Sequence, residues 1–174
     1  MRRTTLAAIL AACALLAGCK QRQVRVQQTE EEAPQLATTV HVADPRAAAQ
    51  LVSGFYDIEQ GSWRWTAGKF AVVLRTPRGS AQKGAVLKLK FNIPDAVMGK
   101  LGPMAVAASV EGTALKPETY TQPGEYIYSR ELAPEVMARD SARVDFHLDK
   151  FLPAGAVDSR ELGVVVISAG FETK

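Results

Sequence analysis

The residues best suited to contact a ligand lie in one aromatic stretch, FYDIEQGSWRWTAGKF, at positions 55–70. Five of the chain's twelve aromatic side chains fall there, including both tryptophans. If Gly61 and Ser62 form a turn and a strand begins at Trp63, then Trp63 and Trp65 share one face of that strand. Indole rings on one face can stack on the apolar face of a sugar, or they can fill the core of a β-sandwich.

These two uses divide the stretch between a candidate site and the core. Tyr56, Trp63 and Arg64, which lie near the turn, are the candidate ligand-binding residues, and a core position for Trp63 stays equally open. Trp65 and Phe70 lead into a strongly apolar run, so we expect them to anchor the core.

Arg64 should point away from the tryptophans, because neighbouring residues of a strand face opposite sides. We expect it to pair with Glu59 or Asp57, or to stack on Trp63. The alternative use of Arg64 is to bind an anionic ligand.

A second group of polar residues, Asp145, His147 and Asp149, alternates with apolar residues in the sequence VDFHLD. On a strand these three would line the outer side, and carboxylates with a histidine can bind a divalent ion. Such a row is nearly straight, however, and a metal site needs ligands from a second element. We therefore interpret it as a solvated strand face and predict no metal site and no cofactor.

No catalytic motif accompanies these residues. Ser53, Ser80 and Ser168 lack the G-x-S-x-G elbow of a nucleophilic hydrolase. Glycosidases use a carboxylate pair at a defined separation, which a sequence does not reveal. The sequence predicts a protein that is not an enzyme.

The N-terminus carries the features of a lipoprotein signal peptide. Arg2 and Arg3 precede an apolar run too short to span a bilayer, and the run ends in LAGC at residues 16–19. This ending resembles the bacterial lipobox, in which the cysteine becomes lipidated. The resemblance implies removal of residues 1–18 and a lipid anchor at Cys19. The alternative is a secretory leader with a chance cysteine.

The residue after the cysteine bears on the destination. By resemblance to Gram-negative lipoproteins, an aspartate there would favour the inner membrane, so Lys20 favours the outer membrane. The expected location is the cell envelope, with the protein anchored to the outer membrane of a Gram-negative bacterium.

Residues 19–35 form a polar, glutamine-rich segment that cannot bury enough apolar surface to order itself. We interpret it as a tether and residues 36–174 as one domain. Cys13 would leave with the signal peptide and Cys19 would carry lipid, so the domain would contain no thiol. Loss of Arg2 and Arg3 from 21 basic side chains leaves 19 against 18 acidic ones, which argues against a nucleic-acid partner.

Within the domain, apolar and polar residues alternate with a period of two between Gly, Pro and Asp, which is typical of β-strands. Short helical turns are expected at residues 44–51, with Asp44 as cap and Pro45 first, and at 134–139. Without a βαβ rhythm, this pattern predicts an all-β fold, a two-sheet antiparallel β-sandwich of the jelly-roll type. The expected strands cover residues 37–42, 69–76, 85–93, 103–110, 125–132, 143–149 and 163–168.

Three segments together resemble a known β-sandwich module. They are GFY to WRWT at 54–66, the VEG and PGE turns at 110–112 and 123–125, and VDF with DSRELGV at 144–146 and 158–164. The resemblance covers residues 51–170. It is to galactose-binding-like modules of bacterial envelope lipoproteins, which are also appended to some glycosyltransferases and polysaccharide-related proteins. It implies an accessory or carbohydrate-associated role and carries over no catalytic residue.

By itself, the DSRELG segment at residues 158–163 is typical of a turn in which a side chain caps the backbone and the charges pair on the surface. No function follows from its residue types. Its role stays open at the level of sequence.

The leading hypothesis is a non-catalytic, lipid-anchored envelope protein that acts as a binding or accessory module, with glycan as the candidate ligand. The competing hypothesis is a structural or assembly lipoprotein that binds a partner protein, and the third is an enzyme acting on polysaccharide. Exposure of Trp63 and Tyr56 beside a concave, partly apolar groove would favour the first hypothesis. Burial of both rings would favour the second.

Overall fold

The structure is a computed structural model that describes residues 35–174. The predicted signal peptide, Cys19 and all but the last residue of the predicted tether lie outside these residues. Within the described part, no helix is both long and apolar enough to cross a membrane.

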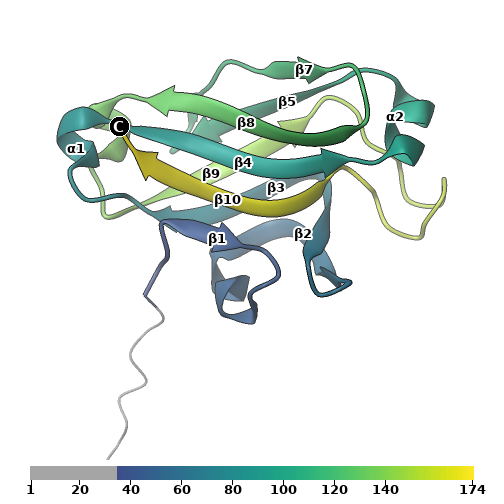
Figure 1. Ribbon diagram of the computed structural model, residues 1–174, viewed down its shortest axis with the longest axis horizontal. Helices are drawn as coiled ribbons and strands as arrows, with labels where there is room; N and C mark the ends of the chain where they lie inside the picture. Colours follow the sequence, from purple (N-terminus) through teal and green to yellow (C-terminus); the bar gives the residue numbers. More distant parts are fainter. Residues whose placement is uncertain (1–34) are drawn as a thin grey trace, which may run out of the picture. The chain divides into compact units, whose positions relative to one another are not determined.

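Short helices and mostly longer strands make up the described domain (Figure 1). The helices are η1 (Pro45–Gln50), α1 (Ser80–Lys83), α2 (Asp95–Leu101) and η2 (Pro134–Met137). The strands are β1 (Thr39–His41), β2 (Leu51–Glu59), β3 (Trp63–Arg75), β4 (Ala85–Ile93), β5 (Met104–Val110), β6 (Thr113–Ala114), β7 (Glu118–Tyr120), β8 (Gly124–Leu132), β9 (Ser141–Leu148) and β10 (Val165–Thr173).

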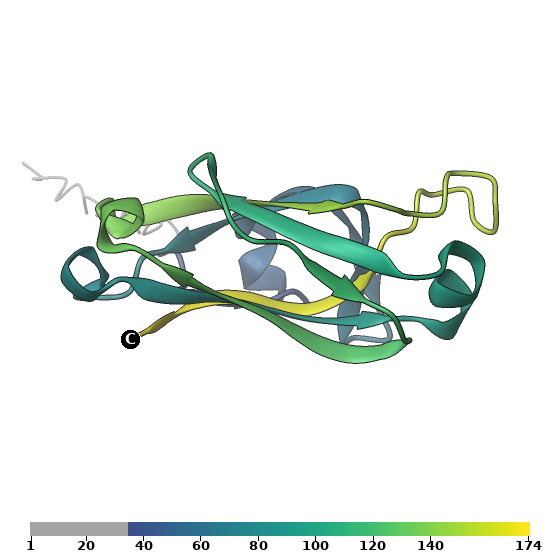
Figure 2. The same ribbon diagram turned by 90° about the horizontal axis from the view of Figure 1, so that it is seen from above.

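The strands form two layers that lie face to face (Figure 2). One layer contains β2, β3, β9 and β5, with β6 and β7 beside β5, and the other contains β1, β10, β4 and β8. β3 joins them, because Arg64 and Trp65 pair with β10 whereas Lys69 to Arg75 pair with β9. Every strand pair is antiparallel within the described part. The fold is therefore an all-β sandwich, as the sequence predicts.

The buried side chains of the core come from strands in which apolar and polar residues alternate. In β4, Leu87, Leu89 and Phe91 have no exposed surface, whereas the side chains of Lys88 and Lys90 are 41% and 45% exposed. Burying one such apolar side chain stabilises a fold by about 1.5–3 kcal/mol. All of the described core residues lie between Val40 and Phe171, so we expect residues 35–174 to fold without the preceding segment.

Three aromatic rings fix β2, β3 and β9 against one another. Phe70 and Phe146 stack with their ring centroids 4.9 Å apart, and Phe55 meets Phe70 edge-on at 5.4 Å. Phe70 is 2% exposed, so its predicted position in the core is confirmed.

The turn that the sequence predicts before Trp63 is present. Gln60 and Gly61 have φ values of 49° and 65°, and the Ser62 N–H donates to the Glu59 carbonyl at 3.1 Å. Two residues with positive φ between antiparallel strands form a type I′ turn, whose twist matches that of a hairpin. β2 and β3 are therefore one hairpin, and Trp63 is the first residue of β3.

Some predicted boundaries are correct and others are wrong. β4 matches its prediction residue for residue, and η1 begins at Pro45 with Asp44 as its cap. β3 is one continuous strand rather than two pieces, and β10 starts two residues later and ends five residues later than expected. β2 and α2 are absent from the prediction. β2 does not alternate cleanly because its register against β3 shifts three times.

Gly54 allows β2 to approach β3 closely. Its φ is +73°, and a Cβ at this position would overlap the Lys69 carbonyl oxygen. We predict that Gly54→Ala lowers the free energy of unfolding by about 2–4 kcal/mol, through backbone strain and steric overlap. Urea denaturation of residues 35–174 would measure the change.

Gly99→Ala in α2 is the matched control. A Cβ there meets nothing within 4 Å and the backbone φ is not positive. The control should be neutral or should raise stability by up to about 1 kcal/mol. Equal effects of the two substitutions would contradict the close approach at Gly54.

Candidate ligand groove on the outer sheet face

A groove of about 490 Å³ lies where β3, β10, β4 and β8 meet on the outer side of the sandwich. Its lining is partly apolar and partly polar. The apolar side chains are Trp63, Trp65, Pro94, Val165 and Ile167, and the polar ones are Glu59, Gln60, Asn92 and Glu125.

Strand register places four of these residues in one row. Trp65 of β3 lies opposite Val165 of β10, which lies opposite Asn92 of β4. Asn92 in turn lies opposite Glu125 of β8. Paired residues point to the same side of a sheet, and Phe91, next to Asn92, is fully buried. The row therefore lies on the side away from the core.

A bulge in β10 shapes the same surface. Val166 pairs with Phe91 and Ser168 pairs with Lys90, so Ile167 is an extra residue without a partner in β4. A bulge re-aims side chains relative to the regular strand. Ile167 is half-buried and lines the groove.

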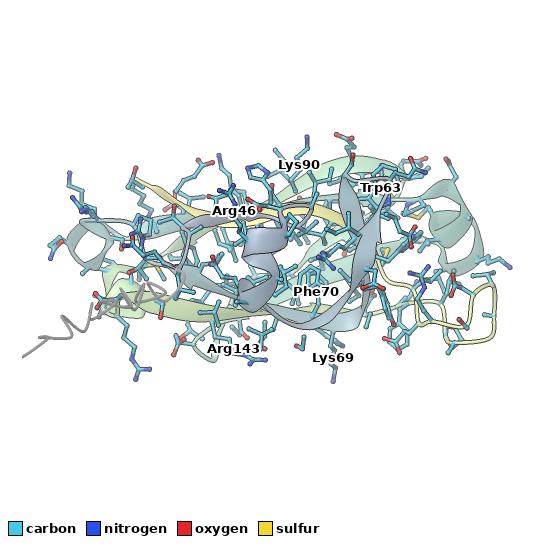
Figure 3. All side chains as sticks on the ribbon, turned by 90° about the horizontal axis from the view of Figure 1, so that it is seen from below. Arg46, Trp63, Lys69, Phe70, Lys90 and Arg143 are labelled. Atoms are coloured by element: carbon cyan, nitrogen blue, oxygen red, sulfur yellow. The ribbon has the colours of Figure 1, made fainter. Side chains whose placement is uncertain are left out.

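Both tryptophans of the chain line the groove, and both are half-buried. Trp65 also packs against the core cluster, which does not include Trp63. The predicted core position of Trp65 is therefore only half correct, because part of the ring faces the groove. Figure 3 shows Trp63 and Lys90 on one face of the domain, with Lys69 and Arg143 on the opposite face.

Two carboxylates border the groove from different strands. Glu59 Oε1 accepts a hydrogen bond from Arg160 Nη1 at 2.8 Å, and Glu125 Oε2 lies 3.6 Å from Lys90 Nζ. An ionised carboxylate has about four acceptor positions on its two oxygens. Both side chains therefore keep acceptors for the hydroxyl groups of a ligand, and the Asn92 amide supplies a donor and an acceptor beside them.

Arg160 holds Glu59 in place and is itself held by the loop before β10. Its Nε and Nη2 donate to the Asp158 carboxylate at 3.1 and 3.0 Å, and the Arg160 backbone N–H donates to Asp158 Oδ1 at 2.9 Å. The guanidinium also lies over the Tyr56 ring, 5.2 Å from its centroid. The Asp158–Arg160 pair therefore positions one wall of the groove.

The same loop is tied to β3 at further points. Glu161 Oε1 accepts the Gly68 N–H at 2.6 Å, and the Gly163 N–H donates to the Thr66 carbonyl at 2.7 Å. The DSRELG segment is thus a turn with paired charges, as its residue types indicate. Its partners reach beyond the turn, to Glu59 and to β3, and this long-range pairing was not predicted.

Arg64 does not take the partners expected for it. Its Nε donates to the Val42 carbonyl and its Nη1 to the Tyr56 carbonyl, each at 2.7 Å. The prediction that Arg64 pairs with Glu59 or Asp57, or stacks on the neighbouring tryptophan, is therefore wrong. The physical reason is the register shift of β2 near Tyr56, which leaves that carbonyl free of the ladder.

Of the three predicted ligand residues, only Trp63 lines the groove. The Tyr56 ring lies beneath Arg160, and Arg64 bonds to backbone carbonyls. Asn92 and Glu125 were not singled out from the sequence. Asn92 had a usable signal, because it continues the outward-facing series of the predicted strand at residues 85–93.

The polar row on β9 has the orientation that the sequence predicts. Val144, Phe146 and Leu148 are buried, while Asp145, His147 and Asp149 lie on the outer side. The Asp145 carboxylate accepts from the neighbouring Arg143 guanidinium at 2.7 Å, and Asp149 Oδ1 accepts a backbone N–H of β5 at 2.6 Å. Within residues 35–174, no three metal-binding side chains come together.

Comparison with known proteins identifies no family. No protein-family model matches the chain, and no curated protein does. Among solved structures, the carbohydrate-binding module CBM36 in complex with calcium and xylotriose is 11% identical, with a TM-score of 0.45 over 78% of this chain and 99% of that one. A GH115 4-O-methyl-α-glucuronidase is 10% identical, with a TM-score of 0.44 over 80% of this chain and 18% of that one. These similarities are too remote to indicate a function.

The Asp158–Arg160 pair predicts a measurable titration. The Asp158 carboxylate accepts hydrogen bonds from the Arg160 side chain and from the Arg160 backbone N–H. These bonds, the side-chain ones most strongly, lower the pKa of Asp158 from 3.8 to about 2. Because the folded pKa lies below the unfolded one, the stability from this pair is present above about pH 4 and is lost as the pH falls through 2. NMR titration of the Asp158 carboxyl should give a midpoint near 2.

Arg160→Gln should return the Asp158 midpoint toward its ordinary value of 3.8. Arg143→Gln, which removes a guanidinium paired with Asp145 instead, should leave the Asp158 midpoint unchanged. An Asp158 midpoint near 3.8 in the unsubstituted domain would refute the pairing.

Proposed function

We propose that the groove binds a glycan and that the protein is a non-catalytic binding module. The observation that carries the proposal is the pair of half-exposed tryptophans beside two carboxylates and an amide. A pyranose has an apolar face of C–H groups and a rim of hydroxyls. Trp63 and Trp65 suit the apolar face, and Glu59 and Glu125 can accept hydrogen bonds from the hydroxyls.

The form of the groove supports a small polar ligand. Its volume of about 490 Å³ falls within the range of roughly 300–1,000 Å³ that is typical of small-molecule sites. Its mixed lining differs from the continuous apolar surface expected at the core of a permanent protein interface. Glu59, fixed by Arg160, offers an acceptor in a defined position, which favours a ligand with a defined pattern of hydroxyls.

The proposal includes the location expected from the sequence. The basic start, the short apolar run and LAGC at residues 16–19 support a lipid anchor at Cys19. A module anchored in this way would hold an envelope glycan close to the outer membrane. These residues lie outside the part that the structure describes, so the anchor is tested separately from the groove.

Intrinsic fluorescence gives a direct test of glycan binding, because both tryptophans of the chain line the groove. We expect residues 35–174 to show a saturable change in tryptophan emission with one class of envelope oligosaccharide. Titrations should cover peptidoglycan fragments, lipopolysaccharide core oligosaccharides and exported polysaccharides. Calorimetry would confirm the affinity. If no class binds, the glycan proposal fails and a protein partner becomes the better explanation.

Substitutions then locate the bound glycan. Trp63→Ala should weaken binding by about 2 kcal/mol, or roughly 30-fold, as truncation of an interface anchor does. Val52→Ala truncates an exposed apolar side chain outside the groove and should leave the affinity within about twofold. Calorimetry suits both variants, since Trp63→Ala removes one fluorophore. Equal losses in the two variants would place the ligand elsewhere.

Cys19→Ala in the full chain tests the anchor. The substituted protein should lose its lipid and appear in the soluble envelope fraction, while the unsubstituted protein sediments with membranes. Metabolic labelling with a fatty acid should mark only the unsubstituted chain. Continued membrane association of the variant after a salt wash would refute the proposed anchor.

A further inference from the structure

A basic surface lies at the end of the domain that carries α1 and η2. Two adjoining pockets of about 520 and 260 Å³ share Arg78, Gly79 and Ser80 in their walls. Figure 1 shows α1 and the C-terminus at this same end. The cationic side chains lining the two pockets, which we call the basic end, are Arg75, Arg78, Lys83, Arg139 and Lys174.

The charge of this surface is one-sided. Among the side chains that line the two pockets, Asp140 is the single carboxylate beside five cations. All five cationic residues are exposed. Arg139 and Lys174 pair with Glu111 and Glu131, at 3.3 and 2.7 Å. Within residues 35–174, no carboxylate lies within 4.0 Å of the charged groups of the other three cations, Arg75, Arg78 and Lys83. Elsewhere, an acid lies within 3.0 Å of each of four other arginines: Arg46, Arg130, Arg143 and Arg160.

Backbone hydrogen bonds hold the segments that carry these cations. The Arg75 N–H donates to the Ala37 carbonyl at 3.0 Å, and the Thr76 N–H donates to the Asp140 carbonyl at 2.9 Å. Thr76 Oγ1 also donates to the Arg139 carbonyl. The β3 end and the segment before β9 are thereby joined, so Arg75 and Arg139 project from one connected frame.

The turn before α1 is fixed in the same manner. Ser80 is 2% exposed, and its hydroxyl donates to the Pro77 carbonyl at 2.7 Å. The Lys83 N–H donates to the Gly79 carbonyl at 3.2 Å. Arg78 therefore sits on an ordered turn between the two pockets.

We propose that the basic end binds phosphate groups, either as free phosphate or as the headgroups of an anionic lipid surface. Guanidinium groups donate two parallel hydrogen bonds to a phosphate and keep their charge at every physiological pH. Arg75 and Arg78, with no carboxylate partner among the described residues, line one pocket with Arg139, which also pairs with Glu111. Together they provide more donors than a single carboxylate can accept. A phosphate group, with its greater charge and its additional acceptor oxygens, matches this arrangement better.

The position of the basic end favours a membrane surface as the source of phosphate. Thr38, next to the start of the described chain, lines the larger pocket. The chain between Cys19 and Ala37 can span at most roughly 65 Å even when fully extended. If Cys19 carries lipid as proposed above, this length is the upper limit on the distance between the anchor and the start of the domain beside the basic end. Binding of free phosphate does not rest on that anchor.

The test uses residues 35–174, which contain the described core but neither Cys19 nor the basic residues that follow it. Inorganic phosphate is titrated while the Nε–Hε signals of arginine are followed by NMR. Flotation with vesicles of phosphatidylcholine, with and without phosphatidylglycerol, tests lipid headgroups. We expect phosphate to shift the signals of Arg75 and Arg78, and the domain to float only with the anionic vesicles at low salt.

The double variant Arg75→Gln/Arg78→Gln should lose at least tenfold in phosphate affinity and should no longer float. Its control, Arg46→Gln/Arg143→Gln, removes two exposed arginine charges elsewhere and should bind as the unsubstituted domain does. Urea denaturation should show that both variants fold. Because the groove lies on another surface, glycan binding should be unchanged in the double variant, so the two proposals fail independently.

Two results support the site and distinguish its ligand. Binding of both phosphate and anionic vesicles assigns the site to lipid headgroups, and binding of phosphate alone assigns it to a soluble phosphate. Three results overturn it: no phosphate-dependent shift, equal flotation with neutral vesicles, or an equal loss of binding in the control variant.

Discussion

The continuity of β3 across both layers is the constraint on which the rest of the structure depends. Its first residues pair with β10 and its later residues with β9, so one strand carries the connection between both layers. Thr66, Phe70 and Leu74 all point inward and are buried. Trp63 and Trp65 have the opposite parity and must therefore face outward. The groove exists because this periodicity continues across the joint between the layers.

This parity explains how much of the site could be predicted. The sequence indicates that Trp63 and Trp65 share a face, and it identifies Phe70 as a core residue. Joining the two segments into one strand would also have placed both tryptophans on the face opposite Phe70. Gly68 concealed this continuity, because glycine is unusual in strands. In the structure Gly68 lies against the Phe151 ring, where a Cβ would not fit.

Other parts of the fold could be predicted from local sequence patterns where the strand pairs with its neighbours in a regular register. β4 alternates over its whole length, so its boundaries and its inward face were both predictable. β2 was not, because three register shifts remove the alternation that identifies a strand. The partner of Arg160 was also beyond local reasoning. Glu59 lies 101 residues away in sequence, and no spacing rule connects positions that only tertiary folding brings together.

The bulge at Ile167 changes the outer surface of β10 without changing which side chains reach the core. Before it, Val164 and Val166 point inward, and after it Ala169 and Phe171 do, so the extra residue reverses the parity of β10. Without Ile167 the strand would alternate regularly and would keep all four of these side chains inward. The core therefore does not require the extra residue. What the bulge supplies is one more apolar side chain on the outer side, where Ile167 lines the groove.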